Sequence, residues 1–230
     1  DDLADMVDMD AVNAFRQRGL NPQHPQMRGS HENGDIFFQN REASNKYYDA
    51  VPDLVEEYMA KINAKIGTNY QLFNYYGAPD ADRVIISMGS ICDVAEEVID
   101  YLNAHGEKVG LVKVRLFRPF AAEKLIEALP ASVQKIAVLD RTKEPGAQGE
   151  PLHQDVIQAL FDAQASGDLA FTNGMPTVVG GRYGLSSKEF TPAMVKGVYD
   201  NLAQDKPKNH FTIGINDDVL GTSLPYDEDY

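Results

Sequence analysis

The sequence predicts an α/β fold in which a doubly wound, mostly parallel sheet of five strands follows an irregular N-terminal arm. Three observations indicate this. Short runs rich in β-branched residues alternate with amphipathic segments of helical length between residues 80 and 215. Those runs are mostly apolar, as expected for strands of a sheet that is covered on both faces. The first 50 residues show neither pattern.

Residues 1–50 are expected to form an arm or linker that arrives from a preceding domain. A short helix is predicted over residues 5–18, because apolar residues recur there at close to helical spacing (Met6, Met9, Val12 and Phe15). Turn-forming residues follow, and then a short extended run at residues 36–38. A core of its own is not expected in this segment, so we predict that it lies on a neighbouring domain.

One α/β domain is expected over residues 51–215. Its first helix begins at Val51, where Pro52 suits the first turn, and ends at the C-cap Gly67. Residues 216–230 are expected to be a linker into the next domain. The predicted strands are residues 84–88, 109–117, 135–140, 177–181 and 209–215, and the helices between them are about residues 92–104, 121–129, 151–164 and 192–202.

The composition argues against two classes of partner. The 230 residues include 21 lysines and arginines against 35 aspartates and glutamates, so the net charge is −14. Nucleic acids and anionic membranes attract clustered basic residues, and a strongly acidic chain is a poor ligand for both. No apolar run reaches about 18 residues, so no membrane span is expected. The single cysteine, Cys92, cannot form an internal disulfide and agrees with a cytoplasmic location.

Motifs for catalysis and for metal binding are missing from the sequence. The five histidines show no spacing typical of a metal site. Gly89 follows the first strand without the G-x-G-x-x-G of dinucleotide sites, so we interpret it as a tight turn in which Ser90 or Asp93 caps the next helix. Cys92 is interpreted as a small buried hydrophobic residue. We therefore predict no catalytic residue and no metal site in this chain.

The loop over residues 139–151 is long, charged and glycine-bearing. Such a loop is large for a plain connection, and loops often carry binding contacts. We predict that it docks on another domain. The residues expected at that interface are Asp140, Arg141, Lys143 and Glu144. The alternative is a loop whose charges are solvated.

The stretch VVGGRYGLSSKEFTPAM, residues 178–194, has the residue types of a phosphate-binding loop without its spacing. A Walker A loop places lysine directly after the last glycine, whereas Lys188 lies four residues beyond Gly184. We interpret the stretch as a strand-end turn, with Thr191 as the N-cap of the next helix. Arg182 and Lys188 would face a neighbouring domain. Contact of these two cations with an anion is the alternative.

Several stretches resemble the pyruvate:ferredoxin (flavodoxin) oxidoreductases. They are GDIFFQNREASN (34–45), LFNYYGAPDA (72–81), VGLVKVRLFRPF (109–120) and residues 139–149, 181–190 and 222–225. The resemblance implies an internal segment of a longer enzyme. That segment would be the end of a thiamine pyrimidine domain, a whole second domain like the transketolase C-terminal domain, and the start of a third.

The resemblance also implies the chemistry of the parent protein. This family of anaerobic metabolism decarboxylates pyruvate oxidatively on thiamine diphosphate with Mg²⁺. It transfers the acetyl unit to coenzyme A, and it passes electrons through [4Fe-4S] clusters to ferredoxin or flavodoxin. The parent would be a homodimer. The motifs for thiamine pyrophosphate and for the clusters are absent here, so we expect the segment to bind no cofactor and to be inactive alone.

Three functions of different classes follow for the segment itself. The leading one is a scaffold that docks on other domains of the same chain. The second is a module at the carboxyl ends of the strands that binds small anions or the phosphates of coenzyme A, with contacts from Arg28, Arg182, Lys188 and Ser223. The third is an interaction domain for an acidic redox carrier, which the net charge of −14 disfavours.

Overall fold

The chain divides into two compact units, and a computed structural model describes residues 1–169 and 171–229. The first unit comprises residues 1–69 and the second begins at residue 70. This boundary lies after the helix that begins at Val51, whereas the sequence placed that helix with the sheet. The units are described separately below.

The first unit is a series of helices. They are α1 (Asp2–Met6), α2 (Met9–Gln17), α3 (Phe37–Glu42), α4 (Asn45–Asp49) and α5 (Val51–Ile66). None of these helices buries a residue. The helix predicted over residues 5–18 is two helices, because Val7 is extended and the Asp8 side chain then caps α2 by accepting from the Ala11 amide at 3.0 Å.

The extended run predicted at residues 36–38 is wrong, because α3 begins there. The amides of Ile36 and Phe37 both donate to the carbonyl oxygen of Asn33, at 3.1 and 3.0 Å. This turn starts a helix that the following residues, Gln39 to Glu42, continue. Local hydrogen bonding therefore overrides the extended preference of the aromatic pair.

Helix α5 forms as its sequence predicts. It has proline in its first turn and ends at Gly67, whose φ of 71° is left-handed and whose amide donates to the Asn63 carbonyl at 2.9 Å. The ammonium group of Lys65 lies 3.1 Å from Asp5 and 3.7 Å from Asp2, which ties α1 to α5. Some apolar residues of α5 are nevertheless exposed, among them Leu54, which is 51% exposed.

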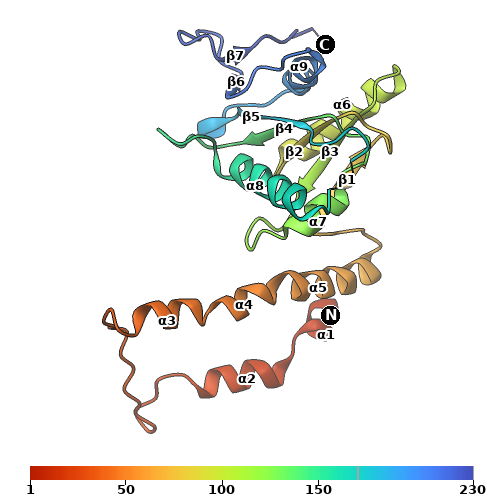
Figure 1. The fold of residues 1–230 in the computed structure, drawn as a ribbon. Coiled ribbons are helices and arrows are strands. Elements are labelled where there is room, and N and C mark those ends of the chain that lie inside the picture. Colours follow the sequence, from red (N-terminus) through yellow and green to blue (C-terminus); the bar gives the residue numbers. More distant parts are fainter. Residues whose placement is uncertain (170, 230) are drawn as a thin grey trace. The chain divides into compact units, whose positions relative to one another are not determined.

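The second unit is built on one sheet (Figure 1). Its strand order is β1-β3-β2-β4-β5-β6-β7. All neighbours pair in parallel except β1, which runs antiparallel to β3 at the edge. The strands are β1 (Phe73–Gly77), β2 (Arg83–Ser87), β3 (Val109–Val114), β4 (Lys135–Asp140), β5 (Thr177–Arg182), β6 (Phe211–Ile213) and β7 (Ser223–Leu224).

The predicted doubly wound α/β class is confirmed, and all five predicted strands are present. The number five is wrong for the described residues, because the sheet has seven strands. The two additional strands lie at its edges. Strand β1 pairs Phe73 with Val114, 41 positions away in the chain, and β7 is only two residues long. Neither has a local pattern that distinguishes it from a loop. Residues 223–224 thus extend the sheet in a region that was predicted to be a linker.

Helices cover both faces of the sheet. They are α6 (Ile91–Ala104), α7 (Ala122–Ala128), α8 (Pro151–Ser166) and α9 (Pro192–Ala203), with a short 3-10 turn, η1 (Leu185–Ser187), after β5. Helices α6 and α9 pack together, and α7 packs on α8 (Figure 1). The largest fully buried side chains include Tyr199 of α9 and Phe211 of β6. The core therefore lies within this unit, between the sheet and its helices.

The connections reverse direction between β2 and β4. The chain passes from β2 through α6 to β3 on one side, and then returns through α7 to β4 on the other side of β2. A doubly wound sheet has a topological switch point where its connections diverge in this way, and ligands commonly bind outside the carboxyl ends of such strands. A candidate ligand site is therefore expected at that edge.

Candidate functional site at the carboxyl ends of the strands

A cavity of about 370 Å³ lies at the switch point, and we call it the switch-point cavity. Gly89 follows β2 and turns the chain with a φ of +83°, as the sequence predicts. Ser90 is the N-cap residue of α6, but its side chain makes no capping hydrogen bond. The lining is mostly apolar and consists of Met88, Gly89, Ser90, Phe117, Leu139, Asp140, Arg141, Thr142, Pro151 and Tyr183.

Asp140, the last residue of β4, makes its side-chain hydrogen bonds within the fold. Its side chain is buried, and its two carboxylate oxygens accept from the backbone amides of Leu152 at 3.0 Å and His153 at 3.1 Å. Asp140 thereby satisfies amides in the first turn of α8 from outside that helix. Burial raises the pKa of this carboxyl, although the two amide donors act against the rise. Both oxygens are thus occupied within the chain.

The other predicted docking residues divide into two kinds. The Arg141 guanidinium donates through Nε to the Gly184 carbonyl at 2.7 Å, which joins the chain after β4 to the chain after β5. Lys143 and Glu144 are exposed on the loop that follows. Asp140 and Arg141 therefore stabilise this edge, whereas Glu144 presents its charge to solvent and Lys143 is exposed but near Glu150. The docking role of all four stays a prediction.

A second cavity, of about 350 Å³, lies beside the ends of β5 and β6, and we call it the β5–β6 cavity. The guanidinium of Arg182 reaches Glu150 Oε1 at 3.4 Å through Nη1 and the His210 carbonyl at 3.1 Å through Nη2. Lys143 Nζ lies 3.9 Å from the same Glu150 oxygen. The lining consists of Lys143, Ala147, Gln148, Gly149, Glu150, Arg182, His210 and Thr222.

Only one of the four predicted anion contacts, Arg182, lines the β5–β6 cavity. Ser223 is next to the lining residue Thr222, but its Oγ accepts from the Ile215 amide at 3.3 Å. Lys188 is exposed after η1, and Arg28, in the first unit, donates to the Arg18 carbonyl. Their role toward the phosphates of coenzyme A stays a prediction.

The predicted strand-end turn after β5 is confirmed. Thr191 is the N-cap of α9, and its side chain accepts from the Met194 amide at 3.4 Å. Ser186 and Ser187, which resembled phosphate ligands, adopt left-handed backbone angles with φ of 53° and 60°. The stretch is therefore a turn into a helix and lacks the arrangement of a Walker A loop.

The sequence did not indicate two buried polar residues of this edge, Glu150 and His153. Each is 2% exposed. Glu150 precedes Pro151 at the start of a helix, where an acidic residue is ordinary, so nothing local distinguishes it. The His153 ring packs where a Cβ of Gly180 would stand, 2.7 Å away, and makes an edge contact with the His210 ring at 5.8 Å between centroids. Only the packing of β5, β6 and α8 brings these groups together.

His153 is held neutral by its surroundings. Neither ring nitrogen has a hydrogen-bond partner among the described residues. Burial, helped by His210, holds the pKa of His153 below the usual 6.5, and the nearby Glu150 carboxylate opposes the shift. A charged imidazolium is therefore disfavoured in the folded chain.

We expect the folded chain to lose stability as the pH falls below about 6.5, because the folded pKa of His153 lies under its unfolded value. The stabilisation by neutral His153 is complete above that pH and is lost as the pH falls through the folded pKa. Unfolding in denaturant at about pH 7.5 and about pH 5.5 measures the loss. His153→Gln should reduce it. The control His105→Gln alters an exposed histidine and should keep it, and equal losses in both variants would contradict the assignment.

Cys92 is buried in this fold. Its thiol lies 3.8 Å from the Ser87 carbonyl, and burial raises its pKa to about 11. The interpretation of Cys92 as a small hydrophobic residue agrees with these surroundings. Across the described part of the chain, no group of three or more histidine, cysteine, aspartate or glutamate side chains is placed to hold a metal ion. No helix there is long and apolar enough to cross a membrane.

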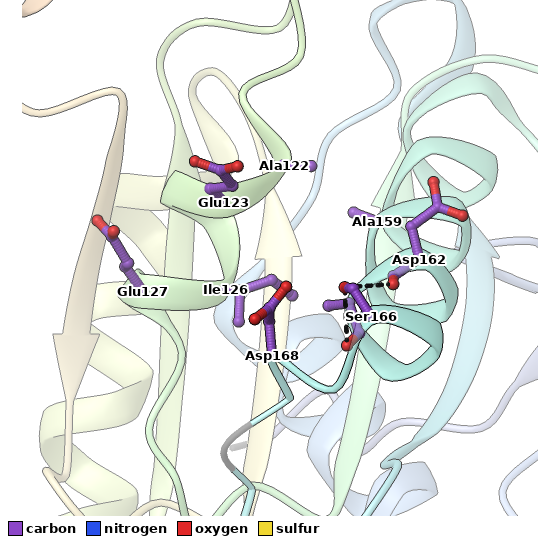
Figure 2. A pocket seen from close by; sticks show the side chains of 9 residues that line it. Ala122, Glu123, Ile126, Glu127, Ala159, Asp162, Ser166 and Asp168 are labelled. Atoms are coloured by element: carbon purple, nitrogen blue, oxygen red, sulfur yellow. Dashed lines mark hydrogen bonds between the residues drawn. The ribbon is translucent and has the colours of Figure 1, made fainter.

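A third cavity, of about 490 Å³, lies between α7 and α8 (Figure 2). Acidic residues from both helices and from the following turn line it, together with alanine, isoleucine and serine residues. In Figure 2, Ser166 turns back onto the α8 backbone, where its hydroxyl donates to the Asp162 carbonyl at 2.9 Å. The lining is Ala122, Glu123, Ile126, Glu127, Ala159, Asp162, Ala163, Ser166 and Asp168. No group in it indicates a ligand.

Comparison with known proteins assigns the chain to a family. Residues 81–183 match pyruvate:ferredoxin oxidoreductase core domain II. The whole chain is 55% identical to a fifth of the pyruvate-flavodoxin oxidoreductase of Nostoc sp., and 99% of it is 58% identical to 19% of the pyruvate:ferredoxin oxidoreductase of Moorella thermoacetica. The chain belongs to the pyruvate:ferredoxin oxidoreductase family. It spans about a fifth of the length of these relatives.

The domain II match of this family runs from before β2 to just after β5. It therefore contains the whole lining of the switch-point cavity, together with Glu150 and Arg182 of the β5–β6 cavity. His210 and Thr222 lie beyond the match. Among solved structures, a 2-oxoglutarate:ferredoxin oxidoreductase from Magnetococcus marinus is 23% identical, with a TM-score of 0.39 over 63% of this chain and 22% of that one.

Proposed function

We propose that this chain is a structural and interdomain-docking segment of a larger pyruvate:ferredoxin or pyruvate:flavodoxin oxidoreductase. That enzyme would oxidatively decarboxylate pyruvate to acetyl-coenzyme A, with thiamine diphosphate, Mg²⁺ and [4Fe-4S] clusters as its cofactors and ferredoxin or flavodoxin as its electron acceptor. The names of the relatives support this proposal, together with the fact that the chain spans about a fifth of their length.

The residues of this chain do not fit the clusters. A [4Fe-4S] cluster takes about four cysteine thiolates, and the chain has one cysteine, which is buried in the core. We therefore assign the redox chemistry to other parts of the enzyme, and the 230-residue chain alone should not turn over pyruvate with coenzyme A and a viologen acceptor. Turnover by that chain would overturn this part of the proposal.

The docking role rests on one observation: many apolar side chains of the first unit are exposed. A unit of 69 residues whose helices bury none of their side chains needs a covering surface, because contiguous exposed apolar area usually marks an interface. The exposed apolar residues of α1 to α5 and their connections include Leu3, Met9, Phe15, Leu20, Met27, Phe37, Phe38, Tyr47, Tyr48, Leu54, Tyr58 and Ile66.

Helix α5 offers the most regular part of that surface. Leu54, Tyr58 and Ile66 stand four and eight positions apart, so they lie along one side of the helix. They are 51%, 41% and 59% exposed. Covering a leucine or isoleucine completely is worth roughly 2 kcal/mol each. We propose that another domain of the same enzyme covers this side.

Polar replacement of this side tests the proposal. In the intact protein, Leu54→Ser with Ile66→Ser should raise the rate of limited proteolysis within residues 1–69 about tenfold or more, because the covering surface loses apolar contact worth several kcal/mol. Ala60→Ser with Ala64→Ser, two exposed positions of the same helix, is the matched control and should leave the rate unchanged. Equal protection in both variants would show that nothing covers α5.

A further inference from the structure

The Glu150 carboxylate is almost fully shielded from solvent, and only one of its two oxygens has a partner in the part of the chain that the structure describes. Its side chain is 3% exposed. Oε1 lies 3.4 Å from Arg182 Nη1 and 3.9 Å from Lys143 Nζ, whereas Oε2 has no hydrogen-bond partner among the described residues. A buried carboxylate oxygen without a donor is costly. The terminal torsion of a glutamate is soft, so a small rotation can turn this oxygen toward the cavity that Glu150 lines.

The net charge of the side chains that line the β5–β6 cavity favours a ligand with a single negative charge. Two cations, Lys143 and Arg182, and one carboxylate, Glu150, line it, so these three side chains together carry a charge of +1. A monoanion brings the total to zero. A phosphate dianion would leave one uncompensated negative charge beside Glu150, in a place where water screens it poorly.

The donors of this cavity fit a carboxylate. Arg182 donates one hydrogen bond from Nη1 to Glu150 and one from Nη2 to the His210 carbonyl. A guanidinium has five N–H donors in a planar fork that matches carboxylate geometry. Lys143 adds an ammonium group from the loop, 3.9 Å from Glu150 Oε1. The remaining requirement is a donor for Glu150 Oε2, which a hydroxyl group next to the carboxylate supplies.

From this arrangement we propose that the β5–β6 cavity binds a small 2-hydroxycarboxylate. Its carboxylate lies against Arg182 and Lys143, and its hydroxyl donates to Glu150. Thr222, whose hydroxyl lies 3.2 Å from that of Thr212, also lines the cavity. This site goes beyond the docking function and does not depend on it.

Calorimetry on the intact protein tests the site with three probes. Glycolate carries both groups and acetate lacks the hydroxyl. Inorganic phosphate, used on the alkaline side of neutrality, is largely a dianion. Glycolate should bind about tenfold more tightly than acetate, the usual effect of one hydrogen bond to a charged group. It should also bind more tightly than phosphate. Equal affinity for glycolate and acetate, tighter binding of phosphate, or no binding of glycolate would each overturn the proposal.

Substitutions in the β5–β6 cavity test whether glycolate binds there. Glu150→Gln keeps the shape, removes the charge and should abolish the preference for glycolate over both other probes. Glu144→Gln, the same change on an exposed residue of the same loop, should keep it. If Glu150→Gln does not fold, Lys143→Met alters only an exposed loop residue and should weaken glycolate and acetate together. Because a pyruvate enzyme can bind glycolate elsewhere, binding that is unchanged in both Glu150→Gln and Lys143→Met would also overturn the assignment.

Discussion

Gly181→Ala is expected to lower the free energy of unfolding of the second unit by about 3 kcal/mol, the upper part of the range for an overpacked core. Gly181 lies in β5, opposite Leu139 of β4 and Phe211 of β6. A Cβ there would overlap Cε2 and Cζ of the Phe211 ring and would stand 2.9 Å from Leu139 Cδ2. Real Cβ atoms essentially never approach another atom within 3.0 Å. Phe211 is fully buried and has nowhere to move.

Chemical denaturation with a double-mutant cycle separates overpacking from other causes. Phe211→Leu makes room for the new methyl group, so Gly181→Ala should cost much less in that background. Gly34→Ala is the control, since no atom lies within 4 Å of its added Cβ. A loss at Gly181 that is the same with and without Phe211 would show that the ring is not the obstacle.

Asp140→Ala is expected to cost about 2 kcal/mol of stability in the isolated chain, because it leaves the buried amides of Leu152 and His153 without an acceptor. Asp140→Asn retains one acceptor oxygen and should lose less. Glu144→Ala, on the same loop but exposed, should leave the midpoint of urea denaturation unchanged.

The same measurement distinguishes the two roles that Asp140 can have. If Asp140 acted at an interface with another domain, its replacement would leave the isolated chain as stable as Glu144→Ala does. A clear loss in the isolated chain assigns Asp140 to the start of α8. The geometry favours this second outcome, since both carboxylate oxygens are already bonded within the fold.

Local signals predicted the centre of the sheet and its helices well. Strand β2 is a run of β-branched residues, and its neighbours in the sheet read the same way, because strands covered on both faces must be apolar throughout. Pro151 and Pro192 each stand in the first turn of a helix, and Gly67 ends α5 in a left-handed conformation. These signals belong to the chain itself and need no partner.

The edges of the sheet could not be predicted in the same way. Strand β1 exists because Phe73 and its neighbours pair with β3, far along the chain, and β7 is held by two residues beside β6. Pairing energy of this kind depends on the neighbour. The boundary between the units was missed for a related reason: the amphipathic pattern of α5 indicates a covered face, but it does not say which surface covers it.

The glycine pair in VVGGRYGLSSKEF shows most clearly what a local sequence pattern cannot predict. By sequence, Gly180 and Gly181 belong either to a phosphate loop or to a turn, and spacing excludes the Walker A loop. The structure supplies the reason for the glycines: the His153 ring occupies the Cβ position of one, and the Phe211 ring that of the other. This requirement arises from side chains 27 and 30 residues away in the chain, so no local pattern contains it.

The sequence by itself determined the α/β class, the five central strands and the four helices that cover them, because periodicity and end signals act within a few residues. It also carried the resemblance to the oxidoreductase family, which the comparisons confirm. Only the tertiary structure decided what the charged residues after β4 do. Asp140 turns inward to the amides of α8, and Glu150 is buried beside Arg182. Burial and pairing of charges depend on which strand ends meet, and that is settled only when the sheet is assembled.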